Sequence, residues 1–125
     1  MPLLTPEQRE QLLANGRQRD VDHVPVVKFF NPIGIGTWLA TELDAGGDIM
    51  FGLAQLNGPP ELGSFSLEEL ATLELPFGMN IERDLFFTGR FPISAYAEVA
   101  RDTGSITAAI RILSNAARAG RGEGD

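Results

Sequence analysis

The residues best suited to chemistry are two carboxylates and one arginine: Glu61, Asp84 and Arg83. Two carboxylates in one cleft can act as general acid and general base, and a guanidinium can bind an anionic group. If folding brings these three side chains together, they can form the site of a small hydrolase. Sequence spacing alone does not establish that they meet. The favoured interpretation is structural, with a partly buried Arg83 paired to Glu61 or Glu42.

His23 is the only histidine and a candidate general base, because imidazole titrates near neutral pH. No serine lies in the Gly-x-Ser-x-Gly context of a nucleophile elbow, and there is no cysteine nucleophile. We therefore interpret His23 as a surface histidine at the edge of a strand.

Trp38 is a further candidate, beside Glu61, Arg83, Asp84 and His23, for an interaction pocket. A surface that stacks nucleic-acid bases would carry basic residues between its aromatic side chains. We therefore expect the aromatic residues in the core, namely Trp38, Phe51, Phe65, Phe86 and Phe87.

We predict no cofactor and no metal site. Without cysteine and with one histidine, the chain cannot form thiolate zinc sites, iron–sulfur clusters or a histidine-rich site. Asp44 and Asp48 share a glycine-containing loop, but this loop is too short to be a calcium-binding loop. Gly34-Ile35-Gly36 lacks the third glycine and the following helix that a dinucleotide fingerprint needs.

The composition is that of a globular protein. The chain has 125 residues, enough for one domain, with 43% hydrophobic and 22% charged residues. No apolar run approaches the ~18 residues of a membrane helix, and the first residues lack a signal-peptide pattern. We therefore expect a cytoplasmic protein that does not bind membranes.

Charge is distributed unevenly along the chain, whose formal net charge is −7. Residues 20–100 hold twelve acids against Lys28, Arg83 and Arg90, whereas both terminal regions are slightly basic. Binding to DNA phosphates normally requires clustered Lys and Arg. The acidic centre therefore makes nucleic-acid binding by a monomer unexpected. It suits a basic protein partner, or simply keeps the protein in solution.

Helix start signals frame a β-rich middle of the chain. Thr5 and Gln8 form a capping box for a helix that ends at Asn15-Gly16, and Ser66 and Glu69 form another, for a helix that ends by Pro76. Runs of β-branched and aromatic residues predict strands over 24–30, 37–43, 49–56 and 81–87, with 61–65 short and extended. Pro92 opens a further helix over 93–101. The short connections favour an α+β fold, with a small antiparallel sheet of about four strands and helices packed on it.

The apolar residues near the C-terminus follow helical spacing, which predicts an amphipathic helix over 106–119. It would follow a single α+β domain over 1–105, and residues 120–125 are expected to be disordered because they lack apolar side chains. Docking of this helix on its own domain is the favoured interpretation, because so short a helix is marginal alone. A homodimer is the alternative, with these residues at the interface: Ile106, Ile110, Arg111, Leu113 and Arg118.

Eight short segments occur in an order that resembles a known bacterial family: LLTPEQ at 3–8, HVPVVKF at 23–29, TWLATELD at 37–44, FGLA at 51–54, PELG at 60–63, SLEEL at 66–70, ERDL at 82–85 and SAY at 94–96. The resemblance covers residues 3–106 and is to the domain of unknown function DUF2958, which is found largely on plasmids and conjugative elements. It implies an accessory protein of mobile DNA, without assigned activity or catalytic residues to transfer.

Three functions stay open at this point. The leading hypothesis is a non-enzymatic acidic interaction protein of mobile genetic elements that presents its acidic surface to a host protein. Its role would be counter-defence, of the anti-restriction or anti-CRISPR type, or regulation. The alternative is the small hydrolase. The third is a DNA-binding regulator, which needs a dimer to concentrate the arginines of the C-terminal helix.

Overall fold

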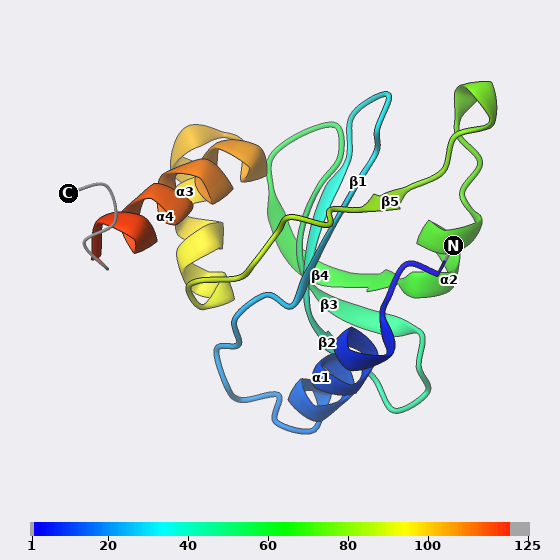
Figure 1. The fold of residues 1–125 in the computed structure, drawn as a ribbon, viewed down its shortest axis with the longest axis horizontal. Helices are drawn as coiled ribbons and strands as arrows, with labels where there is room; N and C mark the ends of the chain where they lie inside the picture. Colours follow the sequence, from blue (N-terminus) through cyan, green and yellow to red (C-terminus); the bar gives the residue numbers. More distant parts are fainter. Residues whose placement is uncertain (1, 121–125) are drawn as a thin grey trace.

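The computed structural model describes residues 2–120 and contains a five-stranded antiparallel sheet with four α-helices (Figure 1). The strands lie in the order β4-β3-β2-β1-β5, so β5 returns to the outer side of β1. The fold class is the predicted α+β, with five strands where about four were expected. In chain order the elements are α1 (Pro6–Gly16), β1 (Val27–Phe30), β2 (Thr37–Leu43), β3 (Ile49–Gln55), β4 (Glu61–Ser66), α2 (Leu67–Thr72), the short 3-10 turn η1 (Pro76–Gly78), β5 (Glu82–Arg83), α3 (Ile93–Thr103) and α4 (Ile106–Gly120).

Local sequence signals account for where the first two helices begin. The Thr5 hydroxyl accepts from the Gln8 N–H at 3.0 Å, and the Thr5 N–H donates to the Gln8 side chain at 2.9 Å, so the predicted capping box is formed. At the start of α2, Ser66 Oγ accepts from the Glu69 N–H at 3.1 Å. α2 ends at Thr72, earlier than predicted, because the backbone is already extended at the next residue.

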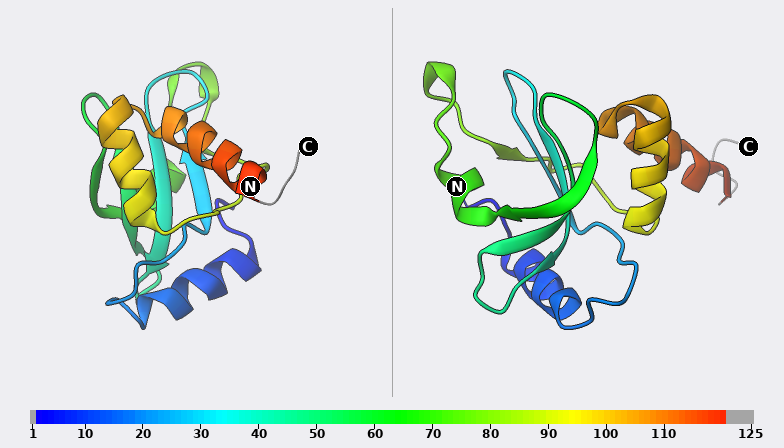
Figure 2. Two further views of the ribbon diagram at one scale, coloured as in Figure 1. Left: turned by 90° about the vertical axis from the view of Figure 1, so that its left-hand side faces the viewer. Right: turned by 180° about the vertical axis from the view of Figure 1, so that it is seen from behind.

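Helices cover both faces of the sheet, with α3 and α4 on one face and α1 and α2 contributing to the other (Figure 2). Trp38 packs in the core that includes Leu12 of α1 and Leu70 of α2. Its neighbour Leu39 points to the opposite face and packs in the core beneath α3 and α4. Every residue of β2 after Thr37 is buried. A strand covered on both faces needs apolar residues at successive positions, which explains why β2 shows no clean alternation in sequence.

The two edge strands differ from the sequence predictions. Residues 61–65 were expected only to be extended, but Glu61–Ser66 forms β4 and pairs with β3 in an unbroken register. β5 is limited to Glu82–Arg83, whereas a strand over 81–87 was predicted. It is short because Asp84 Oδ1 accepts the Phe86 N–H at 2.8 Å, which turns the chain away from β1.

The end of the chain follows the prediction closely where it is described. α4 runs through Gly120, one residue beyond the predicted helix. The rest of the predicted disordered tail, residues 121–125, lies outside the described residues.

α3 is capped from a distant loop. Its N-cap residue, Pro92, makes no side-chain hydrogen bond. Instead, the Asp22 carboxylate accepts from the Ser94 N–H at 3.2 Å and from the Ser94 hydroxyl. The His23 carbonyl also accepts from the Ile93 N–H at 2.8 Å. The loop before β1 therefore fixes the start of α3 and, with it, the helical pair on this face of the sheet.

Candidate functional site

An open cleft of about 800 Å³ lies along the β5 edge of the sheet, and we call it the β5 cleft. Its walls come from the N-terminal segment, the end of β1, α2 and the chain from η1 through β5, which lie together at the right of Figure 1. Arg83 and Asp84, singled out from the sequence, both line it. The lining residues are Pro2, Leu3, Phe30, Ala71 and residues 78–86.

Arg83 fastens the N-terminal segment to β5. One guanidinium nitrogen, Nη1, donates to the Leu3 carbonyl at 3.0 Å and to the Pro2 carbonyl at 3.3 Å. The predicted pairing of Arg83 with Glu61 or Glu42 is therefore wrong, since Glu42 instead pairs with Arg19 at 3.2 Å. Arg83 supports one wall of the cleft by hydrogen bonds to backbone.

Asp84 organises the opposite wall. Its Oδ2 accepts from Lys28 Nζ at 3.1 Å, and its Oδ1 accepts the Phe86 N–H. Lys28 Nζ also lies 5.6 Å from the centre of the Phe30 ring. Burial raises the pKa of the Asp84 carboxyl, but the hydrogen bonds from Phe86 and Lys28 and the charge of Lys28 outweigh it, so this pKa lies below its usual value. Asp84 is thus ionised at neutral pH and holds the turn that presents Phe86.

Two phenylalanines are almost fully exposed at the rim of the cleft. Phe86, within its lining, is 94% exposed, and Phe77, next to the lining residue Gly78, is 93% exposed. Between them in sequence, Leu85 is 67% exposed. Phe77 also has a φ of 64°, a left-handed conformation that is rare and costly for a bulky residue, about 1–3 kcal/mol. An aromatic side chain that is both strained and solvated is typical of a binding surface rather than of a folding core.

Charged side chains of both signs lie at the β5 cleft. Within residues 2–120, the ion pairs are Arg19–Glu42 and Lys28–Asp84. Glu82 lines the cleft, and Glu74 lies three residues after the lining residue Ala71; both are exposed and outside these pairs. The two cations close to the cleft, Lys28 and Arg83, already bind Asp84 and the backbone. Of the charged side chains that line the cleft, Glu82 is exposed, Asp84 is paired with Lys28, and Arg83 is directed at backbone carbonyls.

Glu61 lies far from the other two residues of the suggested hydrolase site. It begins β4, where it pairs with Ala54, whereas Arg83 lies in β5. β4 and β5 are the two outer strands of the sheet, with three strands between them. At an ordinary spacing of about 4.8 Å between strands, about 19 Å of sheet separates them. Glu61, Arg83 and Asp84 therefore do not share a cleft.

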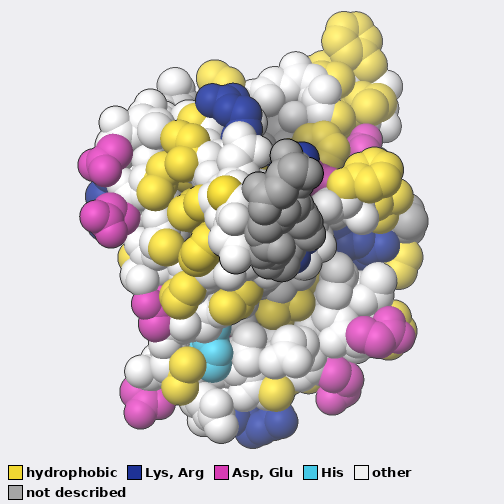
Figure 3. Space-filling model, turned by 60° about the vertical axis from the view of Figure 1, so that its left-hand side comes forward, with side chains coloured by type: hydrophobic (Ala, Val, Ile, Leu, Met, Phe, Trp, Pro, Cys, Tyr) yellow, Lys and Arg dark blue, Asp and Glu magenta, His cyan; other side chains and the backbone are white. Residues whose placement is uncertain are grey.

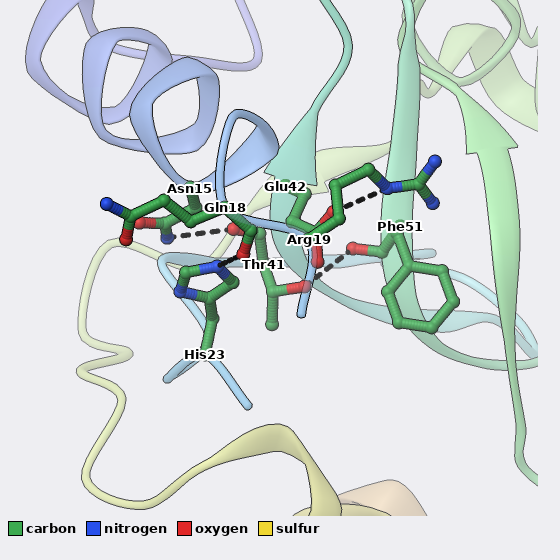
Figure 4. Close-up of polar contacts among 7 residues, drawn as sticks. All are labelled: Asn15, Gln18, Arg19, His23, Thr41, Glu42 and Phe51. Atoms are coloured by element: carbon green, nitrogen blue, oxygen red, sulfur yellow. Dashed lines mark hydrogen bonds and ion pairs between the residues drawn. The ribbon is translucent and has the colours of Figure 1, made fainter. Parts of the chain in front are cut away.

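His23 belongs to a buried polar junction between the α1 loop and β2, drawn in Figure 4. The prediction of a surface histidine is wrong, because His23 is buried. Its Nε2 lies 2.7 Å from the Gln18 carbonyl, which only accepts, so Nε2 carries a proton. In the same junction, Asn15 donates to the Thr41 carbonyl at 2.9 Å. These two hydrogen bonds, from His23 to the Gln18 carbonyl and from Asn15 to the Thr41 carbonyl, hold the loop after α1 against the sheet.

The remaining candidate residues divide between the core and the surface. Trp38 is in the core, as favoured from the sequence, whereas Phe86 is exposed and its predicted burial is wrong. In α4, Ile106 and Leu113 are buried against α3 and the sheet, so the helix packs on its own domain. Ile110 is half-buried in the same cluster, and Arg111 and Arg118 are exposed. Figure 3 shows this face, where hydrophobic side chains form a band with acidic side chains toward its margins.

Sequence reasoning missed the aromatic rim. Phe77 lies in a Pro-Phe-Gly turn, and such a turn places its central residue at the tip of a loop, away from the core. Phe86 follows Asp84, whose side chain commonly accepts the N–H two residues later and breaks a strand. These two local signals were present in the sequence and indicate exposure.

The structure is that of a small α+β protein with a cleft at one edge of its sheet and exposed aromatic side chains in and next to the lining of this cleft. The chain belongs to the family described as protein of unknown function (DUF2958), whose model matches residues 3–107, from the N-terminal segment to the first turn of α4. No curated protein and no solved structure matches the chain. Within residues 2–120, no three or more His, Cys, Asp or Glu side chains are grouped so as to hold a metal ion. None of the described helices combines the length and apolarity needed to cross a bilayer.

Proposed function

We propose that this protein is a non-enzymatic interaction protein that binds a basic segment of another protein in the β5 cleft. The observation that carries the proposal is the presence of two almost fully exposed phenylalanines: Phe86 lines the cleft, and Phe77 is next to the lining residue Gly78. Aromatic side chains that enter a partner's pocket supply much of the binding energy of protein interfaces. Glu74 and Glu82 would attract and orient a partner that carries Lys or Arg.

The polar groups inside the cleft favour binding over catalysis. Arg83 is committed to two backbone carbonyls, and the Asp84 carboxylate is committed to Lys28 and to the Phe86 N–H. The hydrolase site suggested from the sequence needed Glu61 beside Asp84, and Glu61 is on the other edge of the sheet. What the cleft presents freely is apolar surface and the exposed carboxylate of Glu82.

Within this proposal, the partner is a cytoplasmic host protein whose basic site normally binds nucleic acid. A negatively charged protein can compete for such a site, because phosphate recognition depends on the same Lys and Arg side chains. The resemblance to a family carried largely on plasmids and conjugative elements supports a role in counter-defence or in regulation. The net charge of −7 supports the same electrostatic choice of partner.

The test is affinity capture from nuclease-treated bacterial lysate with matched variants of the exposed aromatics. The double variant Phe77→Ser, Phe86→Ser removes both anchors, and Ile35→Ser removes an exposed apolar side chain at the β1–β2 turn, away from the cleft. We expect the wild type and Ile35→Ser to retain the same protein at about 0.05 M salt, and the double variant to lose at least about nine-tenths of it.

Salt and charge provide the second half of the experiment. Capture should fall steeply at about 0.5 M salt, where the Debye length is only a few ångströms. Glu82→Gln should weaken capture, whereas Glu98→Gln, on the exposed side of α3, should not. Capture that is insensitive to salt and equal for wild type and the double variant would overturn the proposal. Retardation of DNA by the purified protein at low salt would favour a nucleic-acid-binding regulator instead.

A further inference from the structure

β4 forms the edge of the sheet opposite the β5 cleft. The hydrogen bonds between β4 and β3 show which residues of β4 direct their backbone N–H and C=O groups away from the sheet. The Leu67 N–H donates to the Asp48 carbonyl at 2.8 Å, one step beyond the paired residues Ile49 and Ser66. Bonded and non-bonded pairs alternate in an antiparallel ladder. Residues 61, 63 and 65 therefore bond to β3, while Leu62, Ser64 and Ser66 direct their N–H groups away from it.

A contact on the other side of β3 confirms this assignment. The Ile49 carbonyl accepts the Asp44 N–H at 2.8 Å, so Ile49 faces β2 and not β4. Its partner Ser66 must then face outward. No backbone hydrogen bond between strands or loops of residues 2–120 uses the outward groups of Leu62 or Ser64.

β4 lacks the features that usually protect an edge strand from pairing. Such edges are commonly blunted by Lys, Pro, a bulge or a covering segment. The six pairs from Glu61 to Ser66 run without a bulge, and no proline or lysine lies within the strand. Leu62 and Ser64 are exposed, and a Cβ added at Gly63 on the face of the sheet would meet no atom within 4 Å. The edge is regular, uncovered by the described chain and long enough to pair with another strand.

The charged residues at the two ends of β4 are acidic, although the Arg9 side chain lies against Gly47 in the β2–β3 turn near one of these ends. The sequence contains no Lys or Arg between Lys28 and Arg83. Glu61 lies at one end of the strand, and Glu68 and Glu69 lie at the other, in the first turn of α2. An occupant with Lys or Arg side chains would meet a carboxylate at each end of β4.

The same charges argue against a second copy of this chain as the occupant. A twofold antiparallel pairing through the outward-facing residues centres on Ser64 and places Leu62 opposite Ser66. It then places Glu61 of one copy opposite Leu67 of the other, the residue before Glu68 and Glu69, at both ends of the contact. One strand edge also buries far less than the about 1,600 Å² of a typical stable interface.

We propose that β4 binds an extended, cationic segment of a partner protein as a sixth strand of the sheet. The outward groups of Leu62 and Ser64 supply backbone hydrogen bonds, and the carboxylates at either end select Lys or Arg side chains. This surface is separate from the β5 cleft, because the two lie on opposite edges of the sheet. The β4 edge would be a second contact surface, which recognises an extended backbone and positive charge in the partner.

A fluorescent peptide of alternating lysine and valine, about eight residues long, is the probe. Its binding to the purified protein is measured by anisotropy at about 0.05 M salt. Ser64→Pro removes one outward N–H and places a ring in the pairing position, without removing a hydrogen bond to β3. Ser64→Ala keeps the N–H and is the matched control. We expect Ser64→Pro to weaken binding at least about tenfold and Ser64→Ala to bind like the wild type.

Charge and location are tested with the same material. A peptide of alternating glutamate and valine should not bind, and the lysine peptide should slow amide exchange at Leu62 and Ser64. Equal binding by wild type and Ser64→Pro, or by both peptides, would overturn the proposal. Protection at Arg83 in place of Ser64 would also overturn it. So would a wild-type dimer that Ser64→Pro converts to a monomer, because the occupant would then be a second copy. Failure here leaves the Phe77 and Phe86 experiment unaffected.

Discussion

The Asp84–Lys28 ion pair gives the sharpest test of how the β5 cleft is built. In Asp84→Asn, the amide oxygen can still accept the Phe86 N–H, but the charge that pairs with Lys28 Nζ at 3.1 Å is lost. The side chains of Lys28 and Asp84 are 16% and 24% exposed. Exposed pairs contribute about 0–1 kcal/mol, and breaking a buried one costs about 3–5 kcal/mol. We therefore expect Asp84→Asn to lower the free energy of unfolding by about 2 kcal/mol at pH 7.

The dependence on pH separates this charge effect from a packing effect. The pKa of Asp84 in the folded protein lies below its usual value of 3.8. A carboxyl with a lowered pKa contributes stability that is present above its unfolded pKa and is lost as pH falls through the folded pKa. The difference between wild type and Asp84→Asn should therefore be constant from pH 7 to about pH 5 and shrink below about pH 4.

Urea unfolding followed by the fluorescence of the single tryptophan, buried Trp38, measures both quantities. Glu98→Gln, an exposed charge change on α3, is the control and should change stability by less than about 0.5 kcal/mol. A midpoint for Asp84→Asn equal to that of the wild type at pH 7 would refute the ion pair as a support of the cleft. A loss that persists unchanged at pH 3 would show that the effect is not one of charge.

Three further outcomes follow from other contacts. Asp22→Ala removes the carboxylate that accepts the Ser94 N–H at the start of α3, and it should lower the free energy of unfolding in urea by about 1 kcal/mol. Amide exchange at the start of α3 should become faster in this variant. Phe77→Gly relieves the left-handed conformation and should raise stability by about 1 kcal/mol in thermal unfolding while it weakens partner capture; a loss of stability would contradict the strain. Gly52→Ala places a Cβ 1.8 Å from the Leu39 carbonyl oxygen and should give little folded protein, judged by circular dichroism, whereas Gly63→Ala should fold normally.

Short-range physics explains what the sequence alone could predict. The capping box of Thr5 and Gln8 joins groups three residues apart, so it is recognised in the sequence without knowledge of the rest of the fold. The helical spacing of Ile106, Ala109 and Leu113 fixed the buried stripe of α4 in the same way. The antiparallel strands followed from short turns, which cannot hold a parallel crossover. The α+β class was therefore available before any coordinates.

The contacts that build the site join residues far apart in the chain, and only the tertiary structure decided them. Arg83 binds the Leu3 carbonyl, and Asp84 binds Lys28, because β5 returns to the outer side of β1. Alternation of apolar and polar residues along a strand predicts which face of the sheet each side chain lies on, but it does not predict which strand pairs with that strand. The same strand order places Glu61 on the opposite edge of the sheet from Arg83 and Asp84, so the suggested hydrolase site does not form. It also left Phe86 beyond the end of the ladder, exposed in a position where pattern alone predicted burial.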